Sequence, residues 1–160
     1  MSIERAKAHL AKYGFSERVR EFAVSSATVA LAAMALGTDE ARIAKTLSFS
    51  LDGAPILVVA AGDAKVNNSK FKSTFHKKAR MLSFCEVETL IGHGVGGVCP
   101  FGINDGVKVY LDESLRRFDT VFPAAGTASS AVELSIPELE LSSEAVGWVN
   151  VTTLPGNEND

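Results

Sequence analysis

The chain has 160 residues, 46% of them hydrophobic and 22% charged, and a formal net charge of −3. This composition is ordinary for a globular protein, and the length suits one domain that buries roughly 70% of the surface of the unfolded chain. No apolar run approaches the ~18 residues of a membrane-spanning helix, and the net charge argues against non-specific affinity for nucleic acid across the whole surface.

The first part of the chain is expected to form helices followed by a β-hairpin. Glycines end the helices, and an alternating polar and apolar pattern marks the strand before Asp52-Gly53, a hairpin turn. The N-terminal helix lacks the apolar core of a signal peptide, which indicates a cytoplasmic protein. In chain order the expected elements are a helix over 2–13, a strand over 19–24, a helix capped by Ser25 or Ser26 and running to Leu36, a short helix over 39–44, and strands over 45–51 and 55–61.

The second part contains shorter elements. Asn67 or Asn68 caps a basic helix, and Ser83 with Glu86 forms a capping box. The expected elements are helices from these caps to about Ala79 and to Ile91, strands over 107–111 and 119–122 with a helical turn over 115–118 between them, a strand over 131–134, a helical turn from Ile136, and a last strand over 147–152. The domain is expected to cover 1–154, with a disordered tail over 155–160. The pattern predicts an α+β fold with a mixed, largely antiparallel sheet flanked by helices.

Charge is polarised along the sequence. Residues 64–80 contain six basic residues and no acidic one, so this segment carries +6 and the rest of the chain carries −9. Such a run is usually a solvated helix face. It also suits contacts to nucleic-acid phosphates, which position a ligand without reading its bases. The candidates for such phosphate contacts are Lys70, Lys72, Lys77, Lys78 and Arg80.

The densest motif is Gly-His-Gly-Val-Gly-Gly-Val-Cys-Pro-Phe-Gly at residues 92–102, which holds five of the 13 glycines. Glycines so closely spaced, with a proline that fixes one backbone angle, indicate a loop whose main chain can approach a bound molecule. The loop lacks the Gly-Lys-Ser/Thr ending of a Walker-type phosphate loop. We therefore expect this loop to contact substrate.

Several patterns follow one another in order: Ala-Thr-Val-Ala-Leu-Ala-Ala-Met-Ala-Leu-Gly at 27–37, Ile-Ala-Lys-Thr-Leu at 43–47, Gly-Asp-Ala-Lys-Val-Asn at 62–67, Gly-Gly-Val-Cys-Pro-Phe-Gly at 96–102 and Val-Tyr-Leu-Asp-Glu at 109–113. Together they resemble the YbaK/EbsC family, free-standing relatives of the editing domain inserted in bacterial prolyl-tRNA synthetases. The resemblance covers about residues 15–145. It implies the fold of that domain and hydrolysis of the ester between a wrong amino acid and the 3′ end of tRNA. The implied partners are mischarged tRNA and prolyl-tRNA synthetase.

The resemblance also implies roles for particular residues. Lys45 matches the family's conserved lysine, which would anchor the 3′ end or polarise the ester. Gly96 and Pro100 bound its Gly-x-x-x-Pro loop, and Gly126 matches a glycine on the far wall of the pocket. The catalytic candidates are Lys45, Gly96, Gly97 and Pro100, and the substrate-binding candidates are Thr28, His93, Val98, Cys99 and Gly126.

Other roles stay open at this point. The Thr28 hydroxyl would bond either substrate or a backbone group, and Asp63 and Asn67 are interpreted first as turn formers. Cys99 invites a thiol-nucleophile hypothesis with His93 as the base. No third, orienting group is visible, however, so lining of the pocket is the favoured interpretation of Cys99. His93 would contact substrate or bond its own loop.

We interpret the chain as a trans-acting aminoacyl-tRNA deacylase for a small amino acid of the Ala, Cys or Ser type, with tRNA-Pro as the expected carrier. Water would be the nucleophile. The three histidines lie far apart and no Cys-x-x-Cys pair occurs, so neither a metal nor a cofactor is expected. Two alternatives remain: a non-catalytic module that binds a nucleotide, aminoacyl-adenosine or tRNA, and a thiol hydrolase that uses Cys99. The two cysteines are expected to be free thiols.

Overall fold

The computed structural model describes residues 2–23 and 28–156. The helices are α1 (Ser2–Ala11), α2 (Val29–Leu36), α3 (Asn68–Phe75), α4 (Phe84–Ile91) and α5 (Ile136–Ser142), with 3-10 helices η1 (Ser16–Arg18), η2 (Glu40–Arg42) and η3 (Glu113–Arg117). The strands are β1 (Val19–Glu21), β2 (Ile43–Leu51), β3 (Ala54–Ala61), β4 (Lys65–Val66), β5 (Lys108–Asp112), β6 (Thr120–Pro123), β7 (Ser130–Val132), β8 (Leu134–Ser135), β9 (Gly147–Val149) and β10 (Thr152–Thr153). No helix among these residues is long and apolar enough to cross a membrane.

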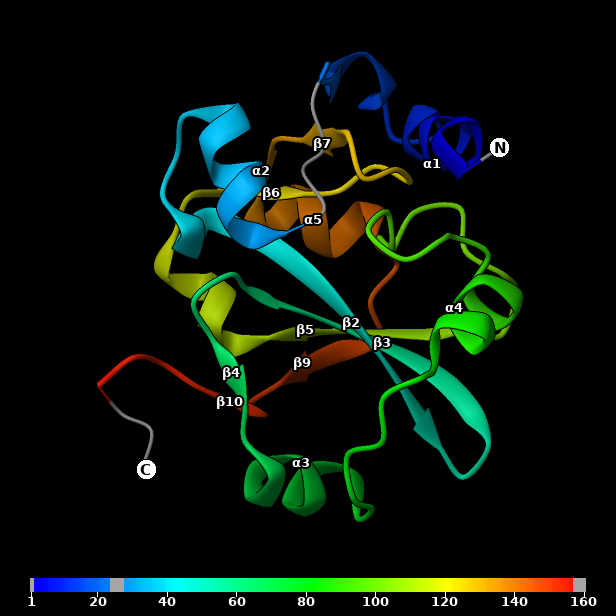
Figure 1. Cartoon of the computed structure of the whole chain (residues 1–160), viewed down its shortest axis with the longest axis vertical. Coiled ribbons are helices and arrows are strands. Elements are labelled where there is room, and N and C mark those ends of the chain that lie inside the picture. The colour runs from blue at the N-terminus through cyan, green and yellow to red at the C-terminus, as the bar shows by residue number, and fades with distance from the viewer. Residues whose placement is uncertain (1, 24–27, 157–160) are drawn as a thin grey trace.

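A six-stranded sheet with the order β8-β6-β2-β3-β5-β9 forms the centre of the fold. In Figure 1, α3 lies below this sheet while α1 and α2 lie above it. Of the seven pairs of described strands, four are antiparallel and three are parallel. The predicted α+β fold with a mixed, largely antiparallel sheet is therefore confirmed.

β2 and β3 form the hairpin that the sequence predicts. Asp52 and Gly53 both have positive φ, at 52° and 84°, which is the conformation that tight two-residue hairpin turns of the mirror-image kind require. Along β3, Leu57 and Val59 belong to one apolar cluster, and Ile56 and Val58 belong to another. Because side chains alternate along a strand, these clusters lie on opposite faces of the sheet.

Aromatic rings dock α3 against the sheet. Phe71 lies 4.8 Å from Phe49 of β2 between ring centroids, and Phe75 lies 4.7 Å from Phe71 and 5.0 Å from Tyr110 of β5. Tilted and edge-on pairs at these separations are favourable beyond their buried area. The aromatic side of the basic helix is thus the side that holds it in place.

The basic helix is shorter than predicted, because it ends at Phe75 rather than near Ala79. His76 takes a left-handed conformation with φ 63°, and its N–H donates to the carbonyl of Lys72 at 2.7 Å. That geometry closes the helix in the way a glycine usually does. Lys77, Lys78 and Arg80 consequently lie on the irregular segment that leads to α4.

Other boundaries also differ from the prediction. The first helix stops at Ala11, and the helix expected over 39–44 is only η2, after which β2 begins at Ile43. The helical turn expected over 115–118 is η3, which begins two residues earlier, and β4 was not predicted. The expected helix caps Ser25 and Ser26 lie outside the described residues, as do the end of the strand expected over 19–24 and residues 157–160 of the expected tail.

Two strands expected to be continuous are each divided. The strand predicted over 131–134 becomes β7 and β8, on either side of Glu133. The strand predicted over 147–152 becomes β9 and β10. Buried Asp112 explains this second break, because its carboxylate accepts the N–H of Val151 at 2.9 Å and the hydroxyl of Thr152 at 2.7 Å. The N–H of Val151 therefore bonds this carboxylate and is not available for a hydrogen bond to a neighbouring strand.

Candidate active site

A pocket opens beside the middle of β2, where the strand has a neighbour on only one side. β6 pairs with just the first two residues of β2. At the other end, segment 80–82 accepts a hydrogen bond from Ser50 at 2.8 Å and donates one to Ser48 at 3.1 Å. Because backbone direction alternates along a strand, Thr46 turns its N–H and C=O toward the same edge as Ser48 and Ser50. One peptide donor and one acceptor therefore face the gap.

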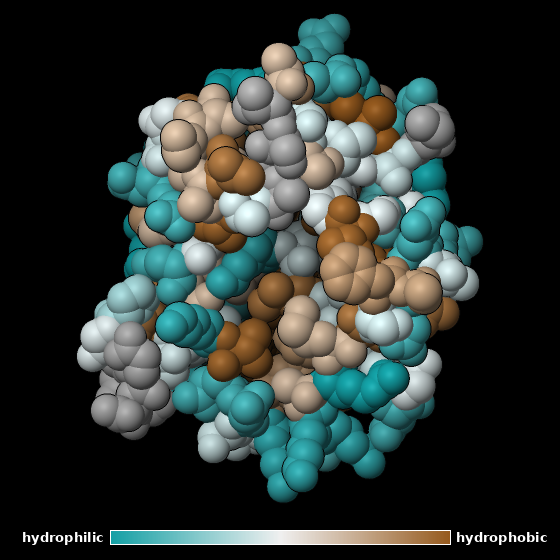
Figure 2. Space-filling view, in the orientation of Figure 1, coloured by the Kyte–Doolittle hydropathy of each residue, from teal (hydrophilic) through white to brown (hydrophobic). Residues whose placement is uncertain are grey.

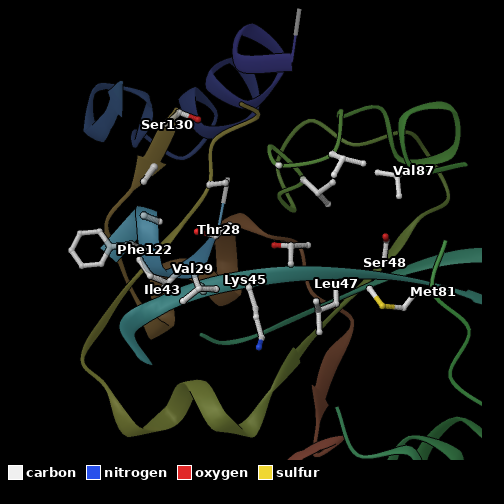
Figure 3. Close-up of a pocket in the computed structure, with 18 of the residues that line it drawn as sticks. Thr28, Val29, Ile43, Lys45, Leu47, Ser48, Met81, Val87, Phe122 and Ser130 are labelled. Atoms are coloured by element: carbon white, nitrogen blue, oxygen red, sulfur yellow. The ribbon is translucent and has the colours of Figure 1, made fainter. Parts of the chain in front are cut away.

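The pocket has a volume of about 330 Å³ (Figure 3). It is bordered by α2, β2, α4, the glycine loop and the β6–β7 region, and most of its lining is apolar. Hydroxyl groups come from Thr28, Thr46, Ser48 and Ser130. The Thr46 hydroxyl is buried and has no hydrogen-bond partner among the described residues. A small, mostly apolar pocket with a few polar groups suits a small substrate group held in a defined orientation.

The glycine loop forms one wall of the pocket through Val95, Gly96 and Val98. Gly96 has φ 93°, a conformation that favours glycine. The N–H of Gly97 is used inside the loop, because it donates to the carbonyl of Gly94 at 3.0 Å. In contrast, the N–H groups of Gly96 and Val98 have no hydrogen-bond partner among the described residues. Within the part of the chain that the structure describes, the pocket wall therefore contains two peptide donors without a partner.

Close backbone contacts fix the position of this loop. A Cβ atom on Gly97 would lie 2.5 Å from the carbonyl oxygen of Gly126, so the two glycines pack main chain against main chain. Both are buried and neither lines the pocket; Pro100 is also buried and does not line it. These three predicted site residues thus support the pocket wall from behind.

The N-terminal helix packs against the far side of the same structure. Arg5 of α1 donates hydrogen bonds to the carbonyl of Gly92 at 3.2 Å and to the Asn104 side chain at 3.0 Å. Gly102 and Gly126 have no room for a Cβ atom, because the backbones of Arg5 and Ser2 occupy that space. α1 therefore contacts both ends of the loop and also Gly126, which packs behind it.

Lys45 lies on β2 at the edge of the pocket and is half-buried. Its side chain leaves the strand on the side opposite to Ser48 (Figure 3). The ammonium donates to the carbonyl oxygens of Gly62, at 3.3 Å, and of Ala64. Burial lowers the pKa of Lys45, and the negative charge of Asp63 acts in the opposite direction. Nothing in the sequence indicated this depressed pKa.

Asp63 fixes the turn that holds Lys45. Its two carboxylate oxygens accept from the guanidinium of Arg117, at 3.1 and 2.6 Å, and this hydrogen-bonded cation lowers the pKa of Asp63. Such bidentate pairs define geometry as well as adding energy. Asn67, by contrast, caps α3, because its side chain accepts the N–H of Lys70 at 2.9 Å.

His93 and Cys99 meet inside the protein and do not line the pocket. The Nε2 atom of His93 lies 2.6 Å from the carbonyl oxygen of Phe101, and the Cys99 Sγ lies 3.5 Å from both of these atoms. Burial lowers the pKa of His93 and raises the pKa of the Cys99 thiol to about 12. A buried, protonated thiol is a poor nucleophile. His93 and Cys99 instead link the two halves of the glycine loop, because both side chains contact the carbonyl oxygen of Phe101.

Thr28 and Ser130 line the pocket, but their hydroxyls are engaged with backbone. Thr28 is the N-cap of α2 and accepts the N–H of Leu31 at 3.1 Å. Ser130 accepts the N–H groups of Ala125 and Thr127 at 3.2 and 3.3 Å. Of the two roles considered for Thr28, the structure shows the backbone bond.

The basic residues differ in how free they are. Lys70 donates to the carbonyl of Thr152 at 2.9 Å, Lys77 pairs with Asp52 at 3.3 Å, and Arg80 pairs with Glu86 at 3.5 Å. Lys72 and Lys78 have no ion-pair partner among the residues that the structure describes, and both line a surface hollow beside α3. The available positive charge is therefore smaller than the +6 of the sequence segment suggests.

Comparison with known proteins identifies the family. The model of the aminoacyl-tRNA editing domain matches residues 24–141, which is well over half of the chain. The chain belongs to this family of YbaK-type editing domains. It is 49% identical over 152 residues to the uncharacterised protein YwhH of Bacillus subtilis (strain 168), covering 94% of this chain and 97% of YwhH.

The editing domain also resembles part of a synthetase and a solved structure. Proline–tRNA ligase of Lysinibacillus sphaericus (strain C3-41) is 31% identical over 77 residues, which are 48% of this chain but only 14% of the ligase. A crystal structure described as a candidate trans-editing enzyme for prolyl tRNA synthetase superposes with a TM-score of 0.86 at 28% identity, covering 95% of this chain and 97% of that one. The resemblance found in the sequence is thereby confirmed.

Several pocket residues of the editing domain were not predicted from the sequence. Ser48 belonged to the polar side of an alternating strand, so the period-two pattern was the signal that could have found it. Met81, Phe84 and Val95 gave no such signal, because an apolar side chain in sequence looks the same whether it is buried or at a pocket mouth. Among the predicted residues, the structure brings Thr28, Lys45, Gly96 and Val98 together around the pocket.

Proposed function

We propose that this editing domain acts in trans as a deacylase, hydrolysing the ester that joins a wrongly attached small amino acid to the 3′ end of tRNA. Alanine, serine and cysteine are the candidate amino acids, and tRNA-Pro is the expected carrier. The observation that carries the proposal is one small pocket lined by three residues whose peptide N–H groups have no partner among the described residues. Gly96 and Val98 contribute N–H groups from the loop, and Thr46 contributes one from the open edge of β2.

These groups match what the reaction requires. An aminoacyl ester is already activated, so water and a stabilised oxyanion suffice for hydrolysis. Water attacks the carbonyl carbon, the bond to the ribose oxygen breaks, and the proton released by the water passes to that leaving oxygen. Preorganised N–H donors stabilise the tetrahedral intermediate, each worth about 2.7–4 kcal/mol in known oxyanion holes. Gly96 and Val98 are the proposed donors.

Lys45 is proposed to anchor the 3′ end. Lys45 lines the pocket edge, and two carbonyl groups hold its ammonium, so the side chain is restrained before substrate arrives. A fixed cation beside the pocket attracts the terminal phosphate and holds the ester in register. Positioning of this kind accounts for much of the rate of many enzymes, and a misplacement of about 1 Å can cost roughly 10²-fold.

The proposed amino-acid specificity follows from the size and chemistry of the pocket. At about 330 Å³ it is near the small end of the range for ligand sites. The hydroxyl of Thr46 has no partner among the described residues and lies on the same strand as Ser48, so the interior offers a hydrogen-bonding surface as well as an apolar one. A small side chain such as that of alanine or serine fits these conditions.

Deacylation of a panel of tRNAs tests the proposal. Purified protein is incubated with Ala-, Ser-, Cys- and Pro-charged tRNA-Pro, and the wild type is compared with Lys45→Met, Gly96→Ala and Cys99→Ala. We expect hydrolysis of at least one small mischarged form, a roughly 10²-fold loss in the first two variants, and retention of activity in Cys99→Ala. No hydrolysis of any member by the wild type would favour a binding module. Loss in Cys99→Ala with retention in Lys45→Met would favour a thiol hydrolase.

A further inference from the structure

Exposed apolar side chains gather at the mouth of the pocket. Seven large apolar side chains are exposed among the described residues, and three of them line this pocket: Phe84 (77% exposed), Met81 (57%) and Val95 (51%). Two more belong to α2, which borders the same pocket. Figure 2 shows the hollow in this face, with brown and tan apolar residues around it. Apolar surface concentrated at one site usually marks a place where something binds.

The backbone of Phe84 is fixed by the start of a helix. Phe84 is the first residue of α4 and lies inside the capping box, in which Ser83 and Glu86 exchange hydrogen bonds of 2.9 and 3.3 Å. Val87 lies one helical turn further on, on the same face, and is buried in the pocket lining. The Phe84 ring therefore stands at the rim directly outside the pocket interior.

We propose that Phe84, with Met81 and Val95 beside it, is a stacking platform for the 3′-terminal nucleobase of the RNA substrate. This inference rests on the proposed function. The pocket interior, at about 330 Å³, suits the aminoacyl group and its ribose, so the base attached to that ribose must lie outside, at the rim. Aromatic side chains are the usual partners of unpaired nucleobases, since every base has a π-face to stack on.

Charge complementarity favours RNA over a protein as the occupant. The segment that leads to Met81 carries Lys77, Lys78 and Arg80, and it runs from α3 up to α4 (Figure 1). Phosphates that follow the stacked base would continue along this segment, with Lys78 and Lys72 free to meet them. Aromatic side chains next to a run of basic residues are typical of proteins that bind single-stranded nucleic acid.

Fluorescence of a modified RNA tests the platform separately from catalysis. The probe is an RNA acceptor-stem hairpin whose 3′-terminal adenine is replaced by 2-aminopurine, which loses fluorescence when it stacks. We expect the wild type to quench the probe, Phe84→Leu to abolish the quenching and bind roughly 5- to 150-fold more weakly, and Phe84→Tyr to stay within about twofold. Leu141→Ala, an exposed apolar position on α5 away from the pocket, is the matched control and should change nothing.

Deacylation assays on the same variants separate the two proposals. We expect Phe84→Leu to raise KM for mischarged tRNA by the same factor, and this factor should not depend on salt, because stacking is uncharged. Quenching that depends on Phe84 in a protein with no hydrolytic activity would refute the deacylase and keep the platform. Unchanged quenching and KM in Phe84→Leu would overturn the platform. So would a change from oligomer to monomer in that variant, by size-exclusion chromatography with light scattering, with RNA binding unchanged, because the rim would then be a protein interface.

Discussion

The contact between Gly97 and Gly126 gives the sharpest test of how the pocket wall is built. In Gly97→Ala the new methyl group would lie 2.5 Å from the carbonyl oxygen of Gly126 and 2.6 Å from Thr127 Cα. These are backbone atoms, so no side chain can rotate away and the loop itself must shift. The φ angle at Gly97 is not in the left-handed region, so the cost is steric and not conformational.

The magnitude follows from this geometry. Overpacking of a close contact costs about 1–3 kcal/mol, and a contact with rigid backbone on both sides belongs at the upper end. For a chain of this length, 2–3 kcal/mol corresponds to a fall in Tm of roughly 4–12 °C. Because the shift also displaces Gly96 and Val98, we expect deacylation to fall by about 10²-fold.

A glycine three residues away supplies the matched control. A Cβ on Gly94 would meet nothing within 4 Å, and its φ is likewise outside the left-handed region. Gly94→Ala should therefore be neutral or stabilising by about 0.4–1 kcal/mol, since alanine restricts the unfolded chain. Differential scanning fluorimetry and urea unfolding measure both variants. Equal Tm values for Gly97→Ala and Gly94→Ala would refute the argument from the Gly97–Gly126 contact.

Three further predictions concern titration, thiol reactivity and RNA binding. Burial lowers the pKa of His93 below its ordinary value of about 6.5, so below pH 6.5 the unfolded chain binds a proton that the folded chain does not. The free energy of unfolding should therefore fall as the pH drops through this region. Urea midpoints measured from pH 7.5 to 5 should fall less in His93→Gln than in the wild type. An identical pH dependence in the two proteins would contradict the assignment. Exposed Cys85 should react with an aromatic disulfide reagent in the native protein, whereas buried Cys99 should react only after unfolding. Rapid reaction of both thiols in the native protein would contradict the burial of Cys99. Lys72→Glu with Lys78→Glu should raise the tRNA concentration for half-maximal deacylation and reduce the salt slope by about two. An unchanged concentration and salt slope in this double variant would contradict the assignment.

Local patterns predicted the elements whose signals lie within a few residues. Asp52-Gly53 required positive φ at both positions and formed the hairpin, and Ser83 with Glu86 formed the capping box. The early end of α3 was not predictable in this way, because His76 adopts a left-handed conformation that the sequence associates with glycine or asparagine. Local chemistry thus indicated where elements begin more reliably than where they end.

The site was predicted less completely, because its geometry depends on distant contacts. The sequence singled out Gly97 for substrate contact, but its packing partner is Gly126, and only the fold shows that the two support the wall from behind. His93 and Cys99 were plausible pocket residues until their burial was seen. The open edge at Thr46 follows from how far β6 extends along β2, which no local pattern records.

The packing of α1 has a mechanical consequence. Residues 24–141 match the editing domain family, so α1 lies outside the matched stretch, yet it contacts both ends of the glycine loop and also Gly126, which packs behind that loop. A single helix thus supports the glycine-loop wall of the pocket from outside the pocket. Displacement of α1 would remove its contacts to both ends of the glycine loop and to Gly126 at the same time. A displacement of the N-terminal helix would therefore alter the pocket wall without any contact inside the pocket.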